Sequence, residues 1–214
     1  MALIAFVYAD LRKDLSQIYR PLCEGLVVNI HDYLPGNRIL HVTDDETPSF
    51  NGCNTLRVKR KVLPMSWRLI AQNLAHATDD EILFLEPDVR LRSSKILEIF
   101  KEPFDVTVCD RETPTTLKGR VMGGITLGMN LSRSFDFWKD CAKECLKLDR
   151  KNQLWGGDMI AVEKVVESGK YKVLTLPAPI YNHVPLGPDE KTDARVVHYK
   201  GKRKTWLFNS MAEV

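Results

Sequence analysis

The chain has 214 residues, of which 44% are hydrophobic and 28% are charged, and this composition excludes a disordered, collagen-like or low-complexity protein. The length suits a single domain. The 31 basic and 28 acidic residues leave a formal net charge of +3, which is too small to require a nucleic-acid partner by itself.

Short apolar strands alternate with amphipathic helices in the first half of the chain. The run at residues 3–9 is continuously apolar, which is typical of a buried strand, whereas residues 56–62 alternate with basic residues, as an exposed strand does. In the helices apolar residues recur at helical spacing, and Pro64 marks a helix start. Strands are expected at residues 3–9, 38–43, 56–62 and 81–85, and helices at residues 15–30 and 64–77.

The second half continues the same alternation. Ser93 is expected to cap a short helix, and residues 121–130 are rich in glycine but apolar. Further strands are expected at residues 105–109 and 171–176, and helices at residues 135–148 and 158–167. Strands separated by helices predict an α/β domain in which a mostly parallel sheet is covered by helices on both faces. No internal repeat or linker divides the chain.

Several features point to an intracellular chain. No apolar run approaches the roughly 18 residues that a membrane-spanning helix needs. The N-terminus reaches Asp10 too soon for a signal peptide, and the five cysteines form no C-x-x-C pair. We therefore expect a cytoplasmic protein with free thiols and no membrane contact. His31 and His76 fall in expected helices and are predicted to lie at the surface or at helix caps.

Acidic residues follow three of the expected strands, at the edge where such sheets bind ligands. They are Asp10, the pair Asp44–Asp45, and the pair Glu86 and Asp88. In extended backbone two residues that are two positions apart point the same way, and Pro87 restrains the turn between them. Two hard oxygen ligands on one side suit Mg²⁺ or Mn²⁺. A plain acidic turn after a strand is the alternative interpretation.

Residues 196–206, with the sequence VVHYKGKRKTW, form a second candidate motif. His198 can donate a nitrogen ligand to a metal, and Gly201 lets the backbone approach a phosphate. The neighbouring lysines could neutralise that phosphate, although a solvated basic tail would look the same. These lysines are Lys200, Lys202 and Lys204.

A third candidate is the run Trp155-Gly156-Gly157-Asp158 before an expected helix. The Asp158 carboxylate could project from the helix N-terminus into a site. It could equally cap the helix by accepting hydrogen bonds from the first free amides, and the two roles are compatible.

Taken in order, these motifs resemble those of a known enzyme family. A strand ending in [DE]-x-D, a Gly-rich apolar strand, an Asp-led helix and a late H-[FY]-x-G-x-x-K-x-W motif are similar to the metal-dependent glycosyltransferases of the GT-A fold, most closely the glycogenin and galactinol-synthase type. The resemblance runs from about residue 3 to residue 207. It implies a single-domain Rossmann-like fold and transfer of a sugar, with retention, from a nucleotide-diphosphate sugar, with a UDP-sugar favoured.

The resemblance also implies roles for individual residues. Glu86, Asp88 and His198 would hold Mn²⁺ or Mg²⁺, and Asp158 would be the catalytic residue near the anomeric carbon. The other implied residues contact the donor: Tyr8 and Asp10 bind the nucleoside, Arg68 is a basic donor-binding residue, Gly123 and Gly124 lie beside the sugar, and Gly201 and Lys204 contact the diphosphate.

Three parts of the chain are expected to divide these tasks. Residues 1–92 would bind the nucleotide, residues 93–194 the sugar and acceptor, and residues 195–214 would close on the diphosphate. Two departures from the family pattern matter. Glu86 replaces the usual first Asp and lengthens one ligand arm. Met122 stands where the family often has an Asn that contacts the sugar, so the identity of the sugar cannot be transferred.

The expected chemistry follows from charge. The departing nucleoside diphosphate gains negative charge, which a divalent cation and Lys204 would stabilise, while Asp158 would support positive charge on the sugar.

The acceptor and two competing functions are left open by the sequence. The basic runs Arg57–Lys61 and Arg195–Lys204 could contact a phosphate backbone, so nucleic acid with a modified, flipped base is one candidate acceptor. Alternatively, the C-terminal cations serve only the diphosphate. A non-catalytic nucleic-acid-binding module would leave Glu86, Asp88 and His198 without a role. A sugar-nucleotide nucleotidyltransferase would need a Gly-rich loop after the first strand, which residues 8–12 do not provide.

Overall fold

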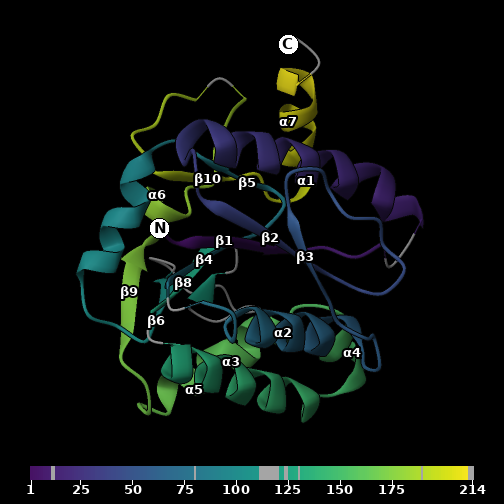
Figure 1. Cartoon of the computed structure of the whole chain (residues 1–214), viewed down its shortest axis with the longest axis vertical. Helices are drawn as coiled ribbons and strands as arrows, with labels where there is room; N and C mark the ends of the chain where they lie inside the picture. The colour runs from purple at the N-terminus through teal and green to yellow at the C-terminus, as the bar shows by residue number, and fades with distance from the viewer. Residues whose placement is uncertain are drawn as a thin grey trace.

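The structure, a computed structural model, describes residues 1–10, 13–79, 81–110, 121–122, 125–129, 131–188 and 190–211. An eight-stranded sheet runs through the molecule in the order β3-β2-β1-β4-β8-β6-β7, with β9 paired to β6 (Figure 1). Its strands are β1 (Leu3–Val7), β2 (Arg38–Thr43), β3 (Asn54–Arg57), β4 (Glu81–Leu85), β6 (Val106–Asp110), β7 (Val121–Met122), β8 (Ile125–Met129) and β9 (Val173–Pro177).

The sheet has a parallel half and a mixed half. Strand β1 pairs in parallel with β2 and β4, β2 pairs in parallel with β3, and β6 pairs in parallel with β9. Strand β8 joins the two halves by antiparallel pairing with both β4 and β6, and β7 is antiparallel to β6. The predicted α/β domain with a mostly parallel sheet is confirmed.

Helices cover both faces of this sheet, as predicted (Figure 1). One face carries α1 (Lys13–Tyr33) and a small sheet of β5 (Val89–Leu91) and β10 (Val196–His198). The other face carries α2 (Pro64–Ala75), α3 (Leu131–Leu146), α4 (Arg150–Leu154) and α5 (Gly157–Glu167). The remaining helices are the 3₁₀ segments η1 (Ser94–Lys101) and η2 (Gly201–Arg203), with α6 (Ala178–Tyr181) and α7 (Lys204–Met211).

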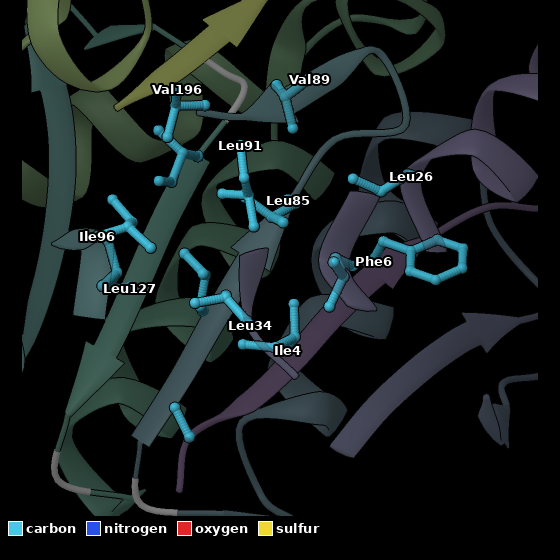
Figure 2. Packing of buried hydrophobic residues seen from close by; sticks show 14 of the residues in the cluster. Ile4, Phe6, Leu26, Leu34, Leu85, Val89, Leu91, Ile96, Leu127 and Val196 are labelled. Carbon is cyan, nitrogen blue, oxygen red and sulfur yellow. The ribbon is translucent and has the colours of Figure 1, made fainter. Parts of the chain in front are cut away.

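Alternating side chains on β1 build a hydrophobic core on each face of the sheet. Ile4 and Phe6 pack on the α1 side, whereas Leu3 and Ala5 pack on the α2 side. Every one of them is almost fully buried, and each large side chain contributes about 1.5–3 kcal/mol when it leaves water. Figure 2 shows the α1 side, where Ile4 and Phe6 lie near side chains from α1, β4, β5, β8 and β10. The strand is thus held from both sides.

The small sheet ties the end of the chain to its middle. Val196 of β10 lies opposite Leu91 of β5, and both are fully buried in the core on the α1 side (Figure 2). The Asn29 side chain of α1 accepts a hydrogen bond from the Leu91 amide at 2.7 Å and donates one to the Leu91 carbonyl at 3.2 Å. Because both backbone groups of Leu91 are satisfied by Asn29, β5 is fixed against α1 by hydrogen bonds as well as by burial.

The structure differs from the sequence-based expectations mainly in short elements. The third strand ends at Arg57 instead of residue 62, and the expectations contained neither β5, β10 nor α4. Elements of three to five residues are too short for a period to be recognised. Among the described residues, no helix combines the length and the hydropathy that crossing a bilayer requires.

His76 lies at a helix cap, which is one of the two positions expected for it, and not at the surface. It occupies the C-cap position of α2, but its ring is fully buried between Phe84 and Trp138 instead of lying at the surface. Neither ring nitrogen has a hydrogen-bond partner among the described residues, and Gly128 leaves the space that the ring fills. Desolvation lowers the pKa of His76 to about 3.

This burial predicts a pH-dependent stability. The unfolded chain binds a proton on His76 below pH 6.5, whereas the folded chain does so only near pH 3. The folded state is therefore fully stabilised by the neutral His76 ring above pH 6.5. As the pH falls toward 3, this contribution to the free energy of unfolding is lost by up to about 1.4 kcal/mol per pH unit. We expect His76→Leu to flatten the pH dependence of the free energy of urea unfolding in this range, whereas the control His31→Leu, at an exposed position, leaves it unchanged. Equal slopes in wild type and His76→Leu would contradict this account.

Candidate active site

A cleft of about 750 Å³ opens at the carboxyl ends of β1 and β4. Open α/β sheets bind ligands at this edge, where the loops after the strands meet. The walls come from segments far apart in the sequence. They are the ends of β1 and β4, the first turns of α2 and α5, Tyr19 of α1, Trp155 and Gly156 between α4 and α5, and His198 with residues 200–204.

Glu86, Asp88 and His198 meet in this cleft. Glu86 and Asp88 follow β4 in a turn that is closed by a hydrogen bond from the Val89 amide to the Glu86 carbonyl. His198 is paired with Val89 in the β5–β10 ladder, and the Tyr199 amide donates to the Asp88 carbonyl at 2.9 Å. The His198 Nε2 atom lies 3.3 Å from Glu86 Oε2 and 3.2 Å from Asp88 Oδ1. The strand pairing therefore sets the distance between the imidazole and the two carboxylates.

Asn182 orients the imidazole of His198. The Nδ1 atom of His198 lies 2.8 Å from Asn182 Oδ1, which can only accept, so Nδ1 carries the hydrogen and Nε2 faces the carboxylates. Asn182 is itself buried, and its backbone amide donates a hydrogen bond to the Ala178 carbonyl at 2.8 Å. Metal-ligating histidines are usually held in this way by a second hydrogen bond.

The three side chains fit a divalent cation. One ligand atom from each lies within 4.8 Å of the others. Carboxylate oxygens are the ligands that Mg²⁺ prefers, and Mn²⁺ also accepts an imidazole nitrogen. The cluster is compatible with a bound divalent metal, and its donor set leaves the identity of that metal open.

Two cations balance the carboxylates of the cleft. Arg68 on α2 forms an ion pair with Glu86, and its Nη1 lies 3.0 Å from Asp158 Oδ2. Lys204 at the start of α7 places its Nζ 2.6 Å from Asp88 Oδ2. With His198 neutral, these groups sum to a charge of −1, so a divalent cation would make the site +1. A site of that charge attracts a diphosphate.

The same contacts set the protonation states. Burial opposes ionisation of Glu86, but the charge of Arg68 and the hydrogen bond from His198 outweigh it and hold the pKa of Glu86 well below its usual range. Burial likewise opposes the charged form of His198, yet its hydrogen bonds to Asp88 and Glu86 and their charges raise the pKa of His198. A metal would take the place of the proton on Nε2, because ligands bind metals in their deprotonated form.

Asp158 lies inside the first turn of α5, and Gly156 is the N-cap. The Asp158 carboxylate is buried, accepts from the Met159 amide at 3.0 Å and faces Arg68. The capping alternative is therefore only partly right, since Asp158 contacts one amide while it also lines the cleft. A carboxylate in this turn is favoured by the helix dipole.

The end of β1 forms another wall. Tyr8 lines the cleft, and its hydroxyl donates to the Asp10 carboxylate. The amide of Asp10 donates to Thr47 Oγ1 at 2.8 Å, which anchors this turn to the loop after β2. Asp10 itself is exposed and does not line the cleft. Burial, followed by the hydrogen bond to Asp10, raises the pKa of Tyr8, so the hydroxyl keeps its proton.

The other predicted residues divide into three groups. Arg68, Gly201 and Lys204 line the cleft, and Gly201 adopts a φ of 60°, which favours glycine. Gly123 and Gly124 lie outside the described residues. The basic runs are only partly available, because several of their arginines contact their own chain: Arg57 with the Asp44 and Thr47 carbonyls, Arg60 with Asp44, and Arg195 with Glu98.

Sequence reasoning missed Tyr19, Met65 and Asn182. Tyr19 and Met65 line the cleft from α1 and α2, and the apolar spacing that predicted these helices singled out neither side chain. Asn182 follows the short helix α6, and no local pattern connects it with His198.

Comparison with known proteins establishes the fold. No protein-family model matches the sequence, and no curated protein sequence matches it. Among solved structures, a glycosyltransferase involved in glycosylation of the major capsid of PBCV-1 superposes with a TM-score of 0.67 at 13% identity, over 100% of both chains. An active-site mutant of LgtC gives a TM-score of 0.60 at 14% identity, over 98% of this chain and 95% of that one. The galactosyltransferase LgtC in complex with donor and acceptor sugar analogues gives 0.56 at 13% identity, over the same shares. The predicted GT-A fold is confirmed.

The metal cluster can be tested directly on the purified protein. We expect Mn²⁺ to bind the wild type, and Asp88→Asn and His198→Ala to abolish that binding, because the first removes a negative charge from the three ligand groups and the second removes the imidazole. Asn182→Ala should weaken Mn²⁺ binding about 10–100-fold, since the imidazole loses its orienting partner. Electron paramagnetic resonance of free Mn²⁺ measures the affinity.

Asp140→Asn is the matched control, because Asp140 lies on α3 outside the cleft. Its Mn²⁺ affinity should equal that of the wild type. Equal affinities in wild type and Asp88→Asn would exclude the cluster as a metal site.

Proposed function

We propose that this protein is a metal-dependent glycosyltransferase that moves a sugar from a nucleotide-diphosphate sugar to an acceptor hydroxyl. The observation that carries the proposal is the meeting of Glu86, Asp88 and His198 with Lys204 in one cleft. The fold shared with solved glycosyltransferases supports the same function by analogy. The narrower assignment to the glycogenin and galactinol-synthase type is part of the proposal and rests on the sequence motifs.

Different walls of the cleft would bind different parts of the donor. Tyr8 at the end of β1 would contact the nucleoside, and Lys204 with the Gly201 backbone would contact the diphosphate. A divalent cation held by Glu86, Asp88 and His198 would supply positive charge to the departing diphosphate. Lys204 adds a second positive charge there and must leave Asp88 to reach a phosphate oxygen.

Asp158 would act at the sugar. Its carboxylate is fixed by Arg68 and by the first turn of α5, so it can stabilise positive charge on the anomeric carbon without moving. Among the described lining residues the carboxylates are Glu86, Asp88 and Asp158, and the first two belong to the metal cluster. Because Asp158 is the remaining carboxylate and Arg68 engages one of its oxygens, we favour retention over an inverting path that needs a free carboxylate base.

The two competing functions have less support. A nucleic-acid-binding module would need the first basic run, but Arg57 and Arg60 are engaged by the loop after β2. A nucleotidyltransferase would need a glycine-rich phosphate loop after β1, and Tyr8, Ala9 and Asp10 contain no glycine.

Donor binding tests the proposal. We expect UDP, UDP-glucose or UDP-galactose to raise the melting temperature only when Mn²⁺ or Mg²⁺ is present, because the metal cluster and the diphosphate neutralise each other. Asp88→Asn should abolish the shift, and Asp140→Asn should retain it. No shift with any of these nucleotides in the presence of metal would refute the proposal, and an unchanged shift in Asp88→Asn would refute its metal dependence.

Lys204→Met should change the affinity for Mn²⁺ and the affinity for UDP in opposite directions. The substitution removes the ammonium group that is paired with Asp88, so the free protein should bind Mn²⁺ more tightly. It also removes a diphosphate contact, so UDP should bind about tenfold more weakly when Mn²⁺ is saturating. Isothermal titration calorimetry measures both affinities. Parallel changes of the two affinities in the same direction would contradict the role assigned to Lys204.

A further inference from the structure

Trp155 is placed unlike the other large aromatic side chains of the described chain. Trp67 and Trp138 are 2% exposed and belong to the core, whereas Trp155 is 70% exposed. It nevertheless lines the cleft, close in sequence to Asp158. An exposed indole forgoes the large stabilisation that burial would give, so its position calls for a partner from outside the chain.

The backbone holds this indole in place. The Trp155 amide donates to the carbonyls of Lys151 and Asn152, both at 3.2 Å. Gly156 adopts a φ of 78°, and a Cβ on Gly157 would lie 2.4 Å from the Asn152 carbonyl oxygen. Two successive positions therefore require glycine to make the turn that leads from Trp155 into α5. The exposure of Trp155 results from a defined turn and not from a loose loop.

The walls of the cleft limit what Trp155 can contact. The residues on the C-terminal segment, including Lys204, carry positive charge and suit the diphosphate, while Tyr8 lies at the end of β1. Trp155 and Asp158 instead come from the α4–α5 connection and the first turn of α5. A ligand on the exposed indole face therefore borders the residue proposed to act at the anomeric carbon. That is the position an acceptor must take.

The flat apolar face of an indole selects the chemistry of that acceptor. A pyranose ring offers a matching face of C–H groups and carries its hydroxyl groups around the ring edge. When it stacks on Trp155, an edge hydroxyl can point into the cleft as the nucleophile. An unmodified nucleobase would also stack, but it carries no hydroxyl. A hydroxymethylated base carries a single hydroxyl, on a substituent of its ring, and it is therefore one of the acceptors in the test below. A serine or threonine side chain has the hydroxyl but no flat ring.

We propose that Trp155 is the stacking platform for a pyranose ring of the acceptor, so that the acceptor is a saccharide or glycoside. This inference rests on the proposed function, because it assigns the acceptor side of the same cleft. No chemical step is added: the acceptor oxygen forms the new bond to the anomeric carbon, and the nucleoside diphosphate leaves with the electron pair of the broken bond. The proton of the acceptor hydroxyl passes to the departing diphosphate.

The experiment uses the full chain with Mn²⁺, UDP-glucose or UDP-galactose, and defined acceptors. The saccharide probes are methyl β-galactopyranoside, methyl α-glucopyranoside, methyl α-mannopyranoside, lactose and maltose. A duplex containing hydroxymethylated bases and a serine-containing peptide represent the other acceptor classes. Mass spectrometry follows transfer, and release of UDP without acceptor follows donor hydrolysis.

We expect at least one saccharide to accept the sugar. Trp155→Ala should raise the KM for that saccharide at least about tenfold, and Trp155→Phe should retain most of the affinity because it keeps a flat ring. UDP affinity and donor hydrolysis should stay at wild-type values in both variants. Leu154→Ala is the matched control, since Leu154 is a neighbouring, 44% exposed side chain that does not line the cleft.

Several results would overturn the inference. They are transfer to the duplex or the peptide but to no saccharide, donor hydrolysis without transfer to any probe, and an unchanged saccharide KM in Trp155→Ala. A loss of UDP affinity in Trp155→Ala would overturn it as well, by assigning the indole to the donor. If the wild type neither binds UDP nor hydrolyses a donor, the proposed function itself fails, and that outcome is distinct from all the others.

Discussion

The antiparallel pairing of β5 with β10 is the constraint on which the candidate site depends. It brings His198 opposite Val89, next to a carboxylate pair that lies more than a hundred residues earlier in the chain. Three residues on each strand would form a weak ladder alone, but Val196 and Leu91 are buried in the core on the α1 side, and Asn29 binds both backbone groups of Leu91. The hydrophobic core therefore fixes the geometry of the polar cluster.

Charge balance gives the cleft its chemical character. A buried carboxylate pair beside a histidine would be costly in a protein interior without compensating cations. Arg68 and Lys204 provide that compensation from two different elements, α2 and α7. Arg68 pairs with both Glu86 and Asp158, so the candidate metal ligands and the carboxylate of α5 share one ion-pair network. Lys204 occupies the carboxylate oxygen that it would exchange for a phosphate, which makes the site ready for an anionic ligand rather than for a neutral one.

The fold and the proposed function rest on different observations. The superpositions cover the chain from end to end, but at identities near 13% they carry the fold and no residue roles. The proposed activity comes from the cleft, which holds a donor set for a divalent metal, cations for a diphosphate and the Asp158 carboxylate of α5, which pairs with Arg68. The exposed indole of Trp155 extends the same cleft toward an acceptor, in a turn that two glycines make possible.

The sequence by itself determined the strands and long helices with clear periods, such as β1, β4 and α1, and the edge at which functional residues gather. It also indicated Glu86, Asp88 and His198, because residue type and chain order are visible without coordinates. Only the tertiary structure decided that these three meet, that Asn182 orients the imidazole and that His76 is buried. Those contacts join segments far apart in the chain through three-residue strands and single hydrogen bonds. Local periodicity contains no information about them, because they arise from burial of the surrounding core.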